Sequence, residues 1–331
     1  MKTLMIGAAA LILAIPTFAQ APARTAAPKA ATAYTAPKTP WGDPDIQGIY
    51  TNKDENGIPL ERPSQLAGKN LADVNDAELQ DLIAERSKAA AERAPGIGGA
   101  DTGAGPTHWY EHYGAKNSRA WLMIDPPDGV IPAPTNEASA RNAERARLRA
   151  GHGPADSPDD RSLYDRCISR GLPGSMMPAI YGNSYEIIQS PGWVAIRYEM
   201  IHETRLIPLD ARPHVKSGIQ TYMGDARGHF EGNTLVVETT NFKPASAYRG
   251  ASEHLKLVER FTPKAARTVE WSVTADDSHT WARPWTFAMN LTKDATQPIF
   301  EYGCHEGNYG LRDILSGARA DEAVAAKAVA K

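Results

Sequence analysis

The chain has 331 residues, of which 42% are hydrophobic and 23% charged, with 27 glycines and 25 prolines. This composition is that of a globular protein and excludes a fibrous, coiled-coil or wholly disordered chain. The formal charge is −3, from 36 basic and 39 acidic residues. Because the sequence also has no basic block, we do not expect nucleic acid as a partner.

The first residues have the pattern of a secretory signal peptide. Lys2 supplies a positive charge, and an apolar run over residues 4–18 leads to a cleavage site after Ala19. The run is shorter than the ~20 residues that a membrane-spanning helix needs, and Pro16 interrupts it. We therefore predict that residues 1–19 are a signal peptide, that the mature protein has no transmembrane segment, and that it is periplasmic or secreted.

The remaining chain divides into a linker, one domain and a tail. Residues 20–40 consist mainly of Ala, Pro and Thr, a composition that is typical of an extended linker. We predict a single α+β domain over residues 41–318, with a helical front at 41–175 and a β body at 176–318. Residues 319–331 are expected to form a flexible tail.

Capping signals and apolar spacing predict three helices in the front. A capping box at Asn75 and Glu78 precedes apolar residues at helical spacing, and Ser157 followed by Pro158 has the form of a helix start. The expected helices cover Asn75–Arg93, Thr135–Ala150 and Ser157–Gly171.

The apolar period changes to two after residue 184, which is typical of strands. Short runs rich in β-branched and aromatic residues are separated by turn sequences. The fold class is therefore α+β and mainly antiparallel β, with N-terminal helical segments packed on a curved meander sheet or a lipocalin-like barrel. The expected strands are Tyr185–Gln189, Trp193–Glu199, Thr204–Leu209, Thr234–Thr240, Leu255–Phe261, Thr268–Thr274, Trp281–Leu291 and Ile299–Cys304.

Strand parity places three charged residues among large apolar side chains on one face of their strands. They are Arg283 between Trp281 and Trp285, Glu259 between Leu257 and Phe261, and Glu301 near Ile299 and His305. Unpaired burial of such charges costs several kcal/mol each, so they should pair with one another or with a ligand. This pattern indicates a binding pocket, although a structural ion pair of Arg283 in an ordinary tryptophan-rich core explains it equally well.

A second group of charged residues follows the strand ends. His229 and Glu231 are two residues apart and can project together, but no third ligand is evident and we expect no metal site. The group also contains Glu199, His202, Arg205, Asp210, Arg212, His214 and Arg227.

The sequence lacks the motifs of serine hydrolases, zinc proteases and dinucleotide-binding proteins. No cofactor is therefore expected, and acid–base catalysis by carboxylates or histidine stays open.

The two cysteines, Cys167 and Cys304, are expected to form a disulfide in an exported protein. On the entropic model, closing this long loop stabilises the folded protein by ~4–5 kcal/mol, because it restricts the unfolded chain. The alternative is that Cys304 is a catalytic thiol with His305 as its base. Adjacent residues on a strand point to opposite faces, so His305 would be poorly placed to take the proton of Cys304.

Four blocks of the sequence resemble, in the same order, a recurrent pattern in a large group of exported bacterial proteins. The blocks are RGHFEGNTLVVETTNF from Arg227, ERF from Glu259, RPWT from Arg283 and EYGCHEGN from Glu301. The resemblance spans about residues 160–319. It implies export and a β-rich body, and it brings no catalytic assignment because no activity is established for the group.

These observations lead to two functional hypotheses. The first is a cofactor-independent enzyme that acts by acid–base chemistry on a small hydrophobic, aromatic molecule. A lyase or an isomerase is favoured over a hydrolase. The expected residues of the enzyme are His305 and Glu301 for proton transfer, Arg283 for an anion or oxyanion, His229 and Glu231 as a second pair, and Trp281, Trp285, Glu259 and Asn308 for substrate contacts. The alternative is a non-catalytic periplasmic protein that binds a hydrophobic small molecule in the same pocket.

Overall fold

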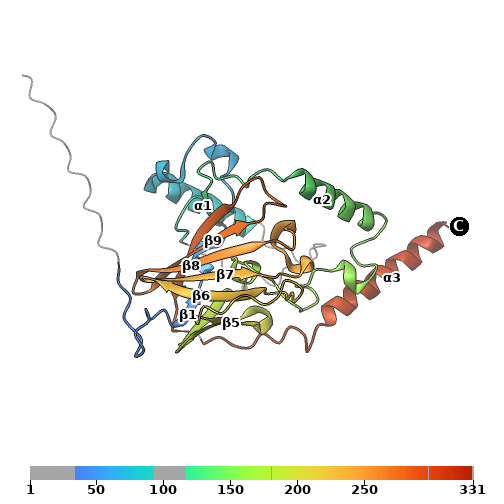
Figure 1. Cartoon of the computed structure of the whole chain (residues 1–331). Helices are drawn as coiled ribbons and strands as arrows, with labels where there is room; N and C mark the ends of the chain where they lie inside the picture. Colours follow the sequence, from blue (N-terminus) through green and yellow to red (C-terminus); the bar gives the residue numbers. More distant parts are fainter. Residues whose placement is uncertain (1–33, 93–115, 180, 297, 330–331) are drawn as a thin grey trace, which may run out of the picture. The chain divides into compact units, whose positions relative to one another are not determined.

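The computed structural model describes residues 34–92, 116–179, 181–296 and 298–329 (Figure 1). The expected signal peptide and the linker up to residue 33 lie outside the described residues. Residues 34–40, which the composition assigns to the linker, contact the sheet. The Asn233 side chain accepts a hydrogen bond from the Ala36 N–H and donates one to the Tyr34 carbonyl, both at 3.0 Å.

Ten strands form one antiparallel sheet that curls into a nearly closed barrel (Figure 1). The main path runs β5-β4-β3-β1-β10-β9-β8-β7-β6, and β2 pairs with β10 outside this path. The strands are β1 Gly48–Thr51, β2 Met123–Asp125, β3 Ser184–Ser190, β4 Trp193–Tyr198, β5 Thr204–Pro208, β6 Asp225–Glu231, β7 Thr234–Thr240, β8 Lys256–Ala265, β9 Thr268–Asp276 and β10 Trp285–Lys293.

The barrel closes where β5 and β6, the two ends of the strand order, approach each other. Gly228 on β6 makes this approach possible, because a Cβ atom there would lie 2.7 Å from Ile207 Cγ2 and 2.9 Å from Leu209 Cδ2. Both distances are below ordinary carbon–carbon contact. A glycine at this position therefore brings the two strands together.

The predicted β body is confirmed, with three differences. Seven of the expected strands are present, whereas β1, β2 and β6 were not predicted. The expected strand Ile299–Cys304 is wrong, because residues 299–308 form no strand and continue into a helix. The strand expected from Trp281 begins only at Trp285.

Two of the three expected helices are confirmed. They are α1, Asp76–Glu92, which follows the Asn75–Glu78 capping box, and α2, Asn136–Arg149, with Thr135 as its N-cap. The third expected helix is wrong, because Ser157 caps only a single 3-10 turn over Pro158–Asp160. The chain then continues in turns, and Cys167 adopts a left-handed φ of 55°.

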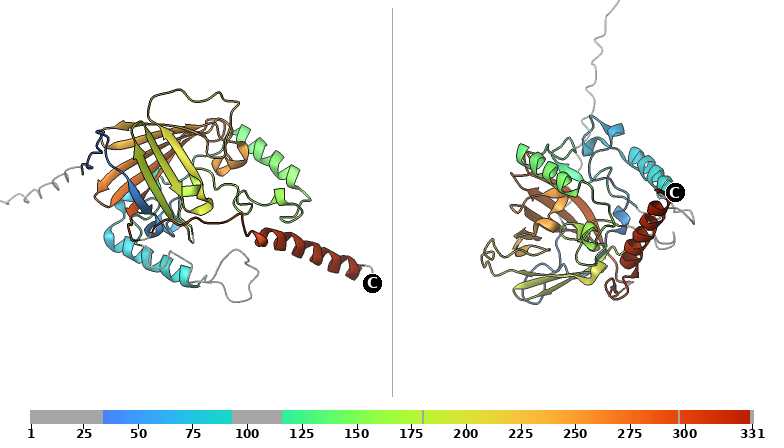
Figure 2. Two further views of the ribbon diagram at one scale, coloured as in Figure 1. Left: turned by 90° about the horizontal axis from the view of Figure 1, so that it is seen from below. Right: turned by 90° about the vertical axis from the view of Figure 1, so that its right-hand side faces the viewer.

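A further helix, α3, covers Tyr309–Val329, where we expected a flexible tail from residue 319 onward. Its first half has half-buried apolar residues at helical spacing, and from Arg319 to residue 328 every side chain is exposed. Figure 2 shows α3 leading away from the strands, whereas α2 lies across one end of them.

The inner face of the sheet forms the core. Alternating residues of β7 to β10 are buried, among them Trp271, Trp285, Phe261 and Phe287, which are all 0% exposed. The alternation follows from the two-residue period of strands. Large aromatic side chains therefore fill the interior of the barrel.

The strand register shows which connections meet at one end of the barrel. β3 and β5 begin at the end where β4, β7 and β9 finish and where β8 and β10 start. The α2 helix packs there, because Thr135 and Arg141 hydrogen bond to residues 279 and 280. This covered end brings together connections that are far apart in the sequence.

Candidate functional site

A buried ion pair lies in the core of the barrel. Glu259 on β8 is 0% exposed, as its strand parity predicted, and its partner is Arg205 on β5, which is 4% exposed. Arg205 donates two hydrogen bonds to the Glu259 carboxylate, and the Trp271 indole N–H donates a third at 3.1 Å. Burial disfavours the charged guanidinium, but Glu259 and Tyr198 together outweigh it, so the net pKa of Arg205 is raised.

Arg283 does not join this pair, and its expected burial between two tryptophans is wrong. It lies in the turn before β10, where strand alternation does not apply. Its side chain is 50% exposed and donates to both oxygens of Asp125 at 2.8 and 2.9 Å. The arrangement is an exposed structural ion pair.

Glu301 and His305 are both exposed, so their expected position on an inward-facing strand is wrong. They belong to the connection between β10 and α3, because the chain leaves the sheet after Lys293. Glu259, Arg283, Glu301 and His305 therefore do not converge on one pocket.

Trp281 and Trp285 are 5% and 0% exposed, with ring centroids 5.4 Å apart in an edge-to-face arrangement. Such packing is typical of a core contact between aromatic rings. Both tryptophans therefore belong to the core, which was one of the two interpretations of the sequence.

His229 and Glu231 project together from β6, as their spacing suggested. The His229 Nε2 atom lies 3.1 Å from Glu231 Oε1, and Arg260 donates to the same carboxylate. Both side chains are about half exposed, at 60% and 49%. In the described part of the chain no group of three potential ligands is arranged to hold a metal ion.

The Cys167–Cys304 disulfide is present, with a Cα–Cα distance of 5.7 Å across 137 residues of sequence. Asn308 strengthens the same junction, because its side-chain amide donates to the Asp165 carbonyl at 2.9 Å. Its oxygen accepts the Leu311 N–H at 3.2 Å and so caps α3. The bridge therefore fixes residues 301–308 against the turn that precedes Cys167, and the rival hypothesis of a catalytic thiol at Cys304 is wrong.

Three tyrosines gather at this junction, and we call Tyr164, Tyr181 and Tyr302 the phenol cluster. The hydroxyl groups of Tyr181 and Tyr302 lie 3.5 Å apart and their ring centroids 6.2 Å apart. Tyr164 interacts electrostatically with Tyr181, and the Arg170 guanidinium lies 5.5 Å from the Tyr164 ring centroid. Three phenols from distant parts of the sequence therefore lie close together.

Burial sets the protonation of this group. Desolvation of the partly exposed Tyr164 side chain and the neighbouring Tyr181 together raise the pKa of Tyr164 to about 12, while Arg170 opposes the shift. Burial also raises the pKa of Tyr302, with a second contribution from its hydrogen bond to Tyr181. Both phenols stay protonated at neutral pH, where they can donate hydrogen bonds to a ligand oxygen.

Polar side chains extend from this junction toward the start of β5. Ser169, two residues after Cys167, is 2% exposed and donates to Glu203 Oε2 at 3.0 Å. The Tyr164 hydroxyl also lies 3.7 Å from Met200 Sδ. The phenol cluster is therefore held between the disulfide and the β4–β5 connection.

The sequence contains a signal for this cluster. Tyr164 lies three residues before Cys167, and Tyr302 lies two residues before Cys304. A disulfide between the cysteines brings together the two short segments that carry these tyrosines. Burial of Arg205 was also detectable, because Arg205 shares a strand face with buried Ile207.

No protein-family model matches the chain, and searches of curated proteins and of solved structures found no significant match. The resemblance to exported bacterial proteins therefore stays a prediction. None of the helices in the described ranges is both long enough and apolar enough to cross a membrane.

Proposed function

We propose that the protein is an exported, cofactor-independent enzyme that acts by acid–base chemistry on a small aromatic molecule at the phenol cluster. The observation that carries this proposal is the group of three neighbouring phenols beside the Cys167–Cys304 disulfide. A neutral phenol donates a hydrogen bond to developing negative charge on a substrate oxygen. This chemistry suits a lyase or an isomerase.

Glu301 and His305 stay candidates for the proton-accepting group. Both belong to the segment that carries Tyr302, and the disulfide at Cys304 lies between them. Their exposure leaves them accessible to a ligand that binds over the cluster. In this proposal Tyr302 and Tyr181 donate to the substrate oxygen and one of the two exposed groups removes a proton.

The disulfide and the absence of a membrane-spanning helix in the described residues are compatible with a periplasmic location. An oxidising compartment keeps such a bridge intact. We therefore place the proposed activity in the periplasm or outside the cell.

The proposal is tested with the mature, oxidised protein and a panel of aryl ketones and aryl β-hydroxy ketones in D₂O. Proton NMR detects exchange at the carbon next to the carbonyl, as well as elimination. For a compound that reacts, Tyr302→Phe should lower the rate about 10²-fold or more, because it removes only the hydroxyl. The matched control is Tyr309→Phe, since Tyr309 is 64% exposed on α3.

Equal rates in wild type and Tyr302→Phe would exclude the phenol cluster as the site. Stable binding of a panel compound without any exchange or elimination would favour the non-catalytic binding protein instead.

A further inference from the structure

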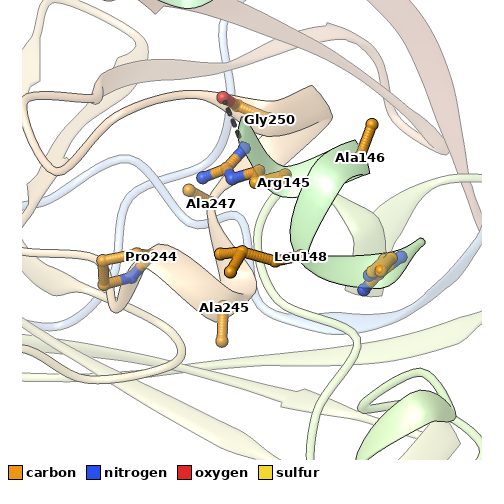
Figure 3. Close-up of a pocket in the computed structure, with 8 residues that line it drawn as sticks. Arg145, Ala146, Leu148, Pro244, Ala245, Ala247 and Gly250 are labelled. Atoms are coloured by element: carbon orange, nitrogen blue, oxygen red, sulfur yellow. Dashed lines mark hydrogen bonds between the residues drawn. The ribbon is translucent and has the colours of Figure 1, made fainter. Parts of the chain in front are cut away.

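A groove outside the phenol cluster runs between α2 and the segment that follows β7. Its volume is about 830 Å³. Figure 3 shows Arg145 and Leu148 reaching from α2 toward this segment, which supplies Pro244, Ala247 and Gly250. Apart from the arginines of α2, the described residues that line the groove are apolar or glycine.

Arg145 is half-buried in this groove and has no carboxylate within 4 Å among the described residues. It makes one hydrogen bond, to the Gly250 carbonyl at 3.3 Å. Two other arginines of α2 differ, because Arg141 and Arg147 pair with Glu137 and Glu144. A guanidinium has five N–H donors, so most of the donors of Arg145 remain available to an anion.

Arg149 is the second cation of the groove and is exposed. It likewise has no carboxylate partner in the described ranges. Leu148, between the two arginines in the sequence, is 61% exposed. The end of α2 thus presents two cations and one apolar side chain to the same groove.

The walls of the groove are held in place before any ligand binds. Gly250 has a φ of +78°, which favours glycine, and a Cβ there would lie 3.4 Å from Arg145 Nη1. On the other side, Arg141 donates to the Thr280 hydroxyl at 2.7 Å. Because both walls are anchored to the barrel, binding requires little reorganisation.

We propose that this groove binds a small amphipathic carboxylate. The carboxylate pairs with Arg145 and Arg149, and the apolar part of the ligand lies along Leu148, Pro244 and Ala247. The charge of the two unpaired arginines and the apolar walls together favour this occupant over a neutral or a purely polar one. The site is separate from the phenol cluster, so it does not depend on the proposed enzymatic activity.

The test compares decanoate with decanol, which has the same chain length and no charge, by titration calorimetry on the mature, oxidised protein. We expect decanoate to bind at least about tenfold more tightly than decanol. Arg145→Gln should weaken decanoate binding by about tenfold or more, and Leu148→Asp should weaken it independently. Arg147→Gln is the matched control on the same helix, because Arg147 pairs with Glu144 and does not line the groove.

Circular dichroism establishes that each variant is folded. Three results would overturn the proposal: no decanoate binding at millimolar concentration, equal affinity for decanol, or unchanged affinity in both Arg145→Gln and Leu148→Asp. Binding to phosphatidylglycerol vesicles without binding to free decanoate would also overturn it and would identify the groove as a membrane contact.

Discussion

Removal of the Glu259 charge should be among the most destabilising single changes in the barrel. The Glu259→Gln substitution keeps the shape of the side chain and an acceptor for the Trp271 N–H, but it leaves the Arg205 guanidinium buried without a counter-charge. Side-chain exposures of 0% for Glu259 and 3% for Arg205 show that water cannot compensate. Breaking such a pair from one side costs about 3–5 kcal/mol.

Urea unfolding followed by tryptophan fluorescence measures this loss as the change in the free energy of unfolding. The matched control is Asp125→Asn, which breaks the pair with Arg283 where both side chains are about half exposed, at 49% and 50%. That change should cost less than about 1 kcal/mol. Comparing the two losses shows whether the stability change comes from the burial of the charges or from the loss of an ion pair alone.

The double variant Arg205→Met with Glu259→Leu completes the test. Because it removes both charges and keeps apolar volume, most of the lost stability should return. A loss in the free energy of unfolding below about 1 kcal/mol in Glu259→Gln would refute the account of the core pair. So would a double variant whose loss equals the sum of the losses in Arg205→Met and Glu259→Leu measured separately.

Two further changes test the barrel closure and the frame of its covered end. Gly228→Ala should cost about 1–3 kcal/mol by overpacking β5 against β6, whereas Gly174→Ala, with no atom within 4 Å of the added Cβ, should cost less in the same urea assay. Asp277→Ala should cost about 2–4 kcal/mol at pH 7, because two backbone N–H groups and two hydroxyls lose their acceptor. Burial opposes ionisation of Asp277, but hydrogen bonds from Thr280 and Ser252 lower its net pKa. Its contribution is therefore present above the unfolded-state pKa of ~3.9 and should fade as the pH drops through the lower folded value. An Asp277 contribution that does not decline as the pH falls below the unfolded-state pKa of ~3.9, or a larger loss at Gly174 than at Gly228, would contradict these assignments.

Local patterns predicted most of the β body and two helices. The period of two in β7 to β9 and the capping box at Asn75 depend only on neighbouring residues, so they are visible in the sequence. The strand β6 was missed because Gly228 and the charged residues around it are not typical of strands. The expected helix from Ser157 failed because an N-cap starts a turn but does not supply the apolar spacing that extends it.

The site was less predictable, because it depends on tertiary contacts. Parity correctly placed Glu259 in the core, yet it could not identify Arg205 as its partner across the barrel. Parity failed for Arg283 and Glu301 because neither residue lies in a strand. The phenol cluster depends on the disulfide, so only a prediction that combined the cysteine pair with the tyrosines beside it would have found it.

The claim that the phenol cluster is the reaction site is tested most directly by a crystal structure. The protein is crystallised with an unreactive analogue of the first panel compound that it converts. We predict an oxygen of the analogue within hydrogen-bond distance of the Tyr181 or Tyr302 hydroxyl. An analogue bound only in the groove beside α2, or anywhere else away from these two hydroxyl groups, would contradict the proposal.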